Sequence, residues 1–96
     1  MLEALFKAVS DRRRREILQL LRRQGTLPVG EIARHFPISA PALSEHLKIL
    51  RKAGLVSARK QRQFVLYSLN TTVFEDLASW VAGFIDKTEV RNDETE

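Results

Sequence analysis

The side chains with the clearest chemical potential in this sequence are its cations, because Lys and Arg bind phosphate and carboxylate groups. Residues 7–62 hold 14 Lys and Arg against 4 Asp and Glu, whereas residues 63–96 hold 2 against 7. The net charge of +4 therefore conceals a basic body followed by an acidic end. A basic surface suits a polyanion. Charge alone does not distinguish DNA from RNA or from an acidic protein as the partner. A basic surface that is only solvated and binds no polyanion is the alternative.

The most unusual group of cations is the run Arg12–Arg15, which begins a predicted helix. Cations in the first turn oppose the helix macrodipole, each at a cost of about 0.3–1 kcal/mol when exposed. Asp11 and Glu16 can pair with some of these arginines, and phosphate groups can pair with others. We therefore expect at least one of them to contact phosphate; a solvated run of charges is the alternative.

Other kinds of chemistry have little support in the residues present. The 96 residues include no cysteine, which excludes disulfides and thiolate metal sites. His35 and His46 have no nucleophile constellation, and the sequence has no glycine-rich phosphate loop, so we do not expect an enzyme. No apolar run approaches the ~20 residues of a membrane span, and no signal segment begins the chain. We expect a cytoplasmic protein without membrane insertion.

The element that must position the basic side chains is a helix expected over residues 40–53. Residues 36–39 are typical of a turn that ends in a helix N-cap, and Gly54 is the residue expected just after the helix. One face of the helix is apolar, formed at helical spacing by Leu43, Leu47 and Leu50. A short helix expected over residues 29–35 precedes the turn. The pair is typical of a helix-turn-helix whose second helix enters the DNA major groove, although two ordinary helices of a bundle are the alternative.

Two further helices and a hairpin complete this part of the predicted order. Apolar residues at helical spacing predict helices over residues 2–9 and 11–23, the second with Ser10 or Asp11 as its N-cap. After Gly54 the apolar period changes to two, which predicts strands over residues 55–60 and 64–69. Three cations lie at or beside the turn between these strands and suggest a basic wing that reaches the DNA backbone or minor groove: Arg59, Lys60 and Arg62.

A last helix, capped by Thr71 or Thr72, carries a wide apolar stripe. A single domain of this size cannot cover that stripe and the apolar face of residues 2–9, and uncovered patches of this size normally mark interfaces. We therefore expect the two end helices to form a two-fold dimer through Leu2, Leu5, Phe6, Val73, Leu77, Trp80, Val81 and Phe84. A membrane-surface helix is the weaker alternative, because the polar side is acidic. One domain is expected over residues 1–86, with a flexible acidic tail over residues 87–96.

Taken together, these features make the sequence similar to the ArsR/SmtB family of bacterial winged-helix repressors over almost its whole length. The matching segments are Leu5–Asp11 with Arg14 and Ile17-Leu18, then Ile32-Ala33, Leu43–Leu50, Ala53–Val56 and Tyr67–Leu69. A closer likeness, to the metal-independent autorepressor SdpR subgroup, is carried by Ile38-Ser39, Pro41, Leu43-Ser44, Gln63–Val65, Tyr67–Val73, Trp80 and Phe84-Ile85. The expected fold is mostly α with a β-hairpin: four helices, two strands and a last helix in a winged helix-turn-helix.

The resemblance implies a homodimer that binds an operator with inverted-repeat half-sites and blocks transcription. In the family, the start and first turns of the recognition helix read bases, which implies that role for Ala40, Pro41, Ser44 and Glu45, with His46 nearby. Ser44 can bond to a base edge or a phosphate, and Glu45 can accept from cytosine or pair with Lys48. His46 can equally pack within the protein. Phosphate contacts are expected from Lys48, Lys52, the three wing cations and the arginine run, in which we select Arg12 and Arg13 as site residues.

Two departures from the family's pattern bear on sensing and on the wing. Metal-sensing relatives carry cysteines where this chain has Leu27–Glu31, or Asp, His and Glu ligands on the last helix, which here has Glu75 and Asp76 but no histidine. We therefore expect no metal cofactor, and control by autoregulation or a regulatory protein partner. Arg62 replaces the usual wing glycine, and because positive φ is unfavourable for arginine the turn geometry stays open. The main prediction is a sequence-specific DNA-binding repressor; a winged helix that docks a protein is the alternative.

Overall fold

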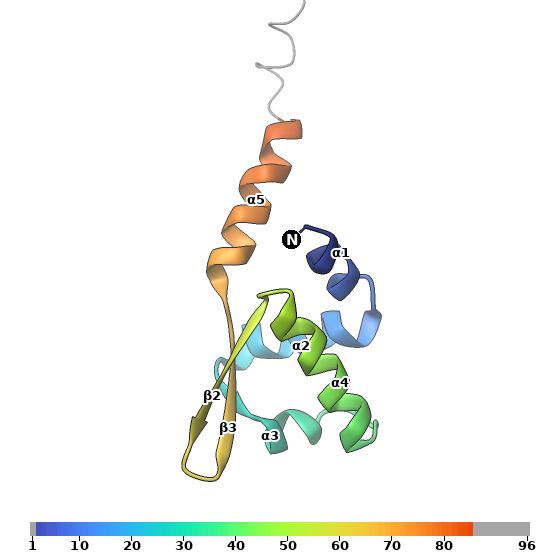
Figure 1. Ribbon diagram of the computed structural model, residues 1–96, viewed down its shortest axis with the longest axis vertical. Coiled ribbons are helices and arrows are strands. Elements are labelled where there is room, and N and C mark those ends of the chain that lie inside the picture. The colour runs from blue at the N-terminus through green and yellow to red at the C-terminus, as the bar shows by residue number, and fades with distance from the viewer. Residues whose placement is uncertain (1, 86–96) are drawn as a thin grey trace, which may run out of the picture.

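The computed structural model describes residues 2–85, which form five helices and a three-stranded sheet (Figure 1). In chain order the elements are α1 (Leu2–Val9), α2 (Arg12–Gln24), β1 (Leu27–Pro28), α3 (Val29–Ala33), α4 (Ala40–Lys52), β2 (Val56–Gln61), β3 (Phe64–Leu69) and α5 (Thr71–Ile85). This order confirms the predicted winged helix-turn-helix and adds the short strand β1. The predicted acidic tail lies outside the described residues. Within residues 2–85, none of the helices has the length and apolar character that crossing a membrane requires.

The two helices that carry most of the candidate site residues begin at the predicted caps. The carboxylate of Asp11 accepts a hydrogen bond from the backbone N–H of Arg14 at 3.0 Å and caps α2. The hydroxyl of Ser39 accepts from the backbone N–H of Ala42 at 3.2 Å and caps α4. These side chains satisfy N–H groups that have no partner within the helix. After each of these helices comes a glycine of positive φ, 81° and 79° respectively: Gly25 and Gly54.

The first helix of the motif, α3, is shorter than predicted. It ends at Ala33, and the N–H groups of the next three residues donate to carbonyls three positions earlier, at 3.0–3.3 Å. Such tight turns are common where a helix ends. They turn the chain toward Ser39, while Phe36 and Ile38 pack against the core. The connection to α4 is therefore anchored by apolar contacts as well as by the helix cap.

The sheet contains the predicted hairpin and one strand that the sequence did not predict. Its order is β1-β3-β2, and both strand pairs are antiparallel. Gln61 pairs with Phe64, so two residues form the turn at the tip of the wing. On the other edge of β3, β1 pairs Leu27 with Tyr67 and Pro28 with Leu66. Strand β1 thus ties the start of the helix-turn-helix to the base of the wing.

One hydrophobic core holds α4 in place. It includes the predicted apolar face of α4. Its buried side chains come from α1, α2, α3, α4 and the start of the wing: Leu5, Ala8, Ile17, Leu18, Leu20, Leu21, Ile32, Leu43, Leu47, Leu50, Leu55 and Val56. Helix α5 is different, because none of its residues is buried. It extends away from the helix-turn-helix beside α1 (Figure 1), and only its first turns pack against the core, through Val73, Phe74 and Leu77.

Candidate nucleic-acid interface

The outer face of α4 lies opposite its three buried leucines and is open to solvent. The exposed residues of this helix are Ala40, Pro41, Ser44, Glu45, Lys48, Arg51 and Lys52. The N-terminal half of the face is small or polar, and the C-terminal half is basic. Hydroxyl and apolar groups can contact base edges, whereas cations can contact phosphates. Sequence reasoning did not select Arg51, although its spacing of seven residues from Ser44 places both on one face.

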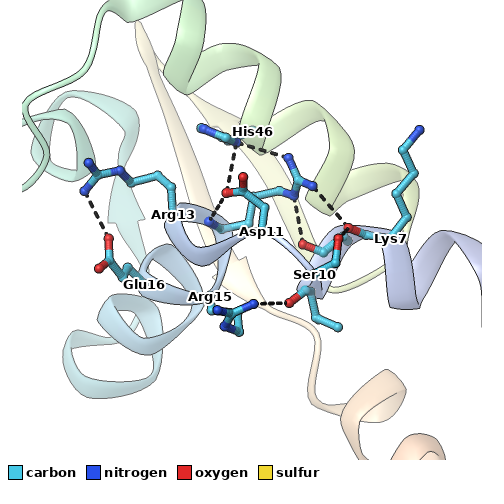
Figure 2. A network of polar contacts seen from close by, with 10 residues as sticks. Lys7, Ser10, Asp11, Arg13, Arg15, Glu16 and His46 are labelled. Carbon is cyan, nitrogen blue, oxygen red and sulfur yellow. Dashed lines mark hydrogen bonds and ion pairs between the residues drawn. The ribbon is translucent and has the colours of Figure 1, made fainter.

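His46 lies differently from the other candidates on α4, because its ring is half-buried and faces α2. Figure 2 shows the ring next to Asp11, with Nδ1 3.9 Å from a carboxylate oxygen. The same Nδ1 lies 3.2 Å from a terminal nitrogen of the Arg14 guanidinium. Because a guanidinium has only donors, Nδ1 must accept this hydrogen bond. His46 thus packs within the protein, which is one of the two roles expected for it. The other role, a contact to a DNA base, stays a prediction.

Arg14 does not belong to the exposed basic surface. Within residues 2–85 it is the one charged side chain that is buried, with 8% exposed. Its guanidinium donates to the backbone carbonyls of Ala8 at 2.8 Å and Lys7 at 3.1 Å, in addition to His46. The expectation that the whole run Arg12–Arg15 contacts phosphate is therefore wrong for Arg14, because its donors are used inside the protein. The burial of Arg14 could have been predicted from helical spacing, because Arg14 lies on the same face of α2 as the buried residues Ile17, Leu18 and Leu21.

The other arginines of the run stay near the surface, where Glu16 orients two of them. The Glu16 carboxylate lies 3.3 Å from Nε of Arg12 and 3.0 Å from a terminal nitrogen of Arg13. The Arg13 guanidinium also lies over the Phe36 ring, 5.2 Å from its centroid, which holds it against the turn before α4. Arg12, with 85% of its side chain exposed, remains open to a phosphate. Both selected arginines thus lie at the edge of the helix-turn-helix.

The contacts around Asp11 lower the pKa of its carboxyl below the ordinary value of 3.8. The main cause is the hydrogen bond from the backbone N–H of Arg14, and the nearby Arg14 charge acts in the same direction, against a smaller effect of burial. The carboxyl is therefore ionised at neutral pH. A negative charge at this position also interacts favourably with the N-terminal end of the α2 dipole. Asp11 offsets part of the unfavourable charge of the arginine run.

The wing exposes its three predicted cations, Arg59, Lys60 and Arg62, on a hairpin that extends from the core (Figure 1). Arg62 has a φ of 60° and is the first residue of the two-residue turn. In hairpin turns whose first central residue has positive φ, that residue is usually glycine, asparagine or aspartate. Arg62 therefore adopts a left-handed conformation that is unfavourable for its side chain, at some cost in backbone strain.

The predicted dimer residues fall into three groups by exposure. Leu5, which we expected to face a second copy, is 4% exposed and packs in the core of its own chain. Val73 and Leu77 are half-buried. Five others are between 41% and 70% exposed and form what we call the end-helix surface: Leu2, Phe6, Trp80, Val81 and Phe84. The ring centroids of Phe6 and Trp80 are 5.9 Å apart and those of Trp80 and Phe84 4.9 Å apart, so α1 and α5 share one aromatic surface.

Comparison with known proteins agrees with this geometry. Residues 11–58, from the cap of α2 into β2, match the family described as bacterial regulatory protein, arsR family. The chain is 49% identical over 83 residues to the transcriptional repressor SdpR of Bacillus subtilis (strain 168), covering 86% of this chain and 91% of that protein. It is 44% identical over 68 residues to the transcriptional activator HlyU of Vibrio cholerae, covering 71% of this chain and 62% of that protein.

The fold has solved counterparts as well. An ArsR-like transcriptional regulator from Rhodococcus sp. RHA1 matches with a TM-score of 0.81 and 28% identity over 94% of this chain and 84% of that one. These relatives are transcriptional regulators rather than enzymes, which confirms both the predicted family and the expectation that the chain is not an enzyme. The chain belongs to the ArsR family and is a DNA-binding transcriptional regulator with a winged helix-turn-helix fold.

Proposed function

We propose that this protein represses transcription, its own gene included, by binding an inverted-repeat operator as a homodimer that needs no metal. The observation that carries the proposal is the outer face of α4, where a solvent-exposed N-terminal half is flanked by cations on α2, α4 and the wing. We infer repression rather than activation from the similarity to SdpR, which is named a transcriptional repressor.

Base reading is assigned to the N-terminal half of α4. Ala40 and Pro41 offer apolar contacts, for instance to a thymine methyl group, and the Ser44 hydroxyl can bond to a base edge. The Glu45 carboxylate can accept from a cytosine amino group. In the described part of the chain no ion pair joins Glu45 to Lys48, so this carboxylate is available for such a contact.

Phosphate contacts are assigned to cations on three elements. They are Arg12 and Arg13 on α2, Lys48 and Lys52 on α4, and Arg59, Lys60 and Arg62 on the wing. Phosphate contacts fix the position of a protein on the duplex but do not read sequence. If about eight phosphates are neutralised per dimer, log K falls with log salt concentration at a slope near −7.

The end-helix surface supports a two-fold dimer. Its aromatic side chains are exposed in the single chain, and α5 projects away from the core so that a second copy can pack on it. A two-fold protein presents its recognition helices to successive major grooves about 34 Å apart, and such an arrangement matches an inverted repeat.

Metal-free operation is supported by where the two histidines lie. His46 is next to the permanent charge of Arg14, which disfavours a bound cation. His35 lies at the surface with Nε2 4.0 Å from a Glu31 oxygen, and the chain has no cysteine to join them. Isothermal titration with zinc tests this part: tight stoichiometric zinc binding that weakens the DNA complex would refute it.

A gel shift with DNA from upstream of the protein's own gene tests the proposal as a whole. The expected result is a complex at low salt that competitor DNA of unrelated sequence does not displace. An unrelated fragment of the same length is the matched control. No shift at low salt would instead favour the alternative of a protein-docking module.

A further inference from the structure

The buried guanidinium of Arg14 joins three helices at one point. Its donors reach the carbonyls of Lys7 and Ala8 in the last turn of α1 and Nδ1 of His46 on α4, while Arg14 itself belongs to α2. The last carbonyls of a helix have no partner within it and carry the negative end of the dipole. Arg14 therefore caps the C-terminal end of α1 and, with the same group, holds a residue in the middle of the recognition helix.

The chemistry of this contact is specific to arginine. A buried cation is costly unless its donors are paired, and apolar side chains often fill such a place at a lower cost in stability. Only a planar guanidinium offers donors in a fixed fork, here to three acceptors on two helices. A lysine amine at this position cannot reach all three. The arrangement therefore fixes an orientation between helices in addition to filling the core.

Both ends of the link lie beside surfaces to which we assign function. On one side, Phe6 precedes the carbonyls that Arg14 contacts, and its ring packs against Trp80 in the end-helix surface. On the other side, His46 follows Ser44 and Glu45, which are exposed on the outer face of α4. The contact path thus runs from the dimer surface through the end of α1 and Arg14 to the recognition helix.

We propose that Arg14 is a positioning residue for DNA recognition, which acts through His46 to hold α4 in a set orientation relative to α1 and thereby to the dimer axis. The inference rests on the proposed function, in which α1 contributes to the dimer and α4 enters the major groove. It assigns His46 the role of a link rather than a base-reading residue.

The test compares DNA affinities of full-length variants by fluorescence anisotropy, with the upstream fragment that the wild type binds. H46L removes the acceptor and should weaken binding roughly tenfold, the scale of a coupled contact. H46N keeps an amide oxygen near the Nδ1 position and should bind within about twofold of the wild type, since the acceptor for Arg14 is kept. R14K should weaken binding to a similar extent as H46L. The double variant R14K/H46L should bind no more weakly than R14K.

Thermal unfolding and sedimentation of each variant distinguish an altered orientation of α4 from a loss of folding or dimerisation. Q24A, a substitution at the exposed end of α2, serves as the matched control. Equal losses in H46L and H46N, or losses that multiply in the double variant, would overturn the inference, because His46 would then act on DNA independently of Arg14. If R14K does not fold, the comparison of H46L with H46N decides alone. A wild type that binds no DNA would instead remove the proposed function itself.

Discussion

At the scale of single residues, the environment of each arginine in the run Arg12–Arg15 depends on its position around the helix and not on its residue type. The run Arg12–Arg15 contains four identical side chains, yet one is buried, one lies on an aromatic ring and one is almost fully exposed. Composition suggests one role for all four. The helical phase relative to Ile17 and Leu21 separates Arg14 from its neighbours, and this phase can be read from the sequence.

Removal of the Asp11 cap should cost stability. D11A should lower the free energy of unfolding by about 1 kcal/mol at pH 7, because the N–H of Arg14 loses its acceptor. D11N keeps a capping oxygen and should cost less.

The pKa of Asp11 is lower in the folded state than its ordinary value of 3.8, so the charged carboxylate stabilises the fold at pH values above 3.8. This contribution to stability disappears as the pH falls through the lowered pKa. Urea unfolding at pH 7 and pH 3 measures this: the difference between wild type and D11N should shrink at pH 3, and a constant difference would contradict it.

Substitution of Arg62 should change stability and affinity in opposite directions. R62G relieves a left-handed conformation and should raise the free energy of unfolding by about 0.5–1 kcal/mol after allowance for the more flexible unfolded chain. The same change removes a wing cation and should weaken DNA binding. R62A is the matched control, since it loses the charge but keeps the strain. Thermal unfolding that finds R62G no more stable than R62A would show that the turn is not strained.

At the scale of elements, locally encoded features could be predicted and long-range ones could not. The caps at Asp11 and Ser39, the apolar face of α4 and the wing hairpin depend on residues a few positions apart, and all appear as predicted. Strand β1 has only two residues, too few for a period, and forms only because β3 pairs with it from far along the chain. The burial of Leu5 likewise depends on how α1 packs on α2 and α4, which spacing within α1 does not reveal.

The two halves of α4 should respond differently to substitution. S44A should reduce the preference for operator over unrelated DNA while leaving the salt dependence unchanged, because a base contact carries sequence information and no charge. K48A should weaken binding to both DNAs and make the salt slope shallower by about 2 per dimer, one phosphate being lost per chain. Anisotropy titrations over a range of salt concentrations measure both effects. The assignment fails if S44A weakens binding to both DNAs equally.

At the scale of the whole molecule, the chain alone leaves an aromatic surface exposed that a second copy can cover. F84E places a charge on the end-helix surface, where Phe84 is 70% exposed, and should produce a folded monomer that binds the operator at least tenfold more weakly. E75A, an exposed change on the same helix, is the control and should remain dimeric. Sedimentation velocity at micromolar concentration distinguishes them. A dimeric F84E would place the interface elsewhere.

The stoichiometry and salt dependence of operator binding test the central claim, a symmetric pair of chains that presents two basic recognition surfaces to one duplex. In a titration of labelled operator with the full-length protein, we predict saturation at two chains per duplex and a slope of log K against log salt near −7 for about eight phosphates. Saturation at one chain per duplex, or a slope near zero, would contradict the account.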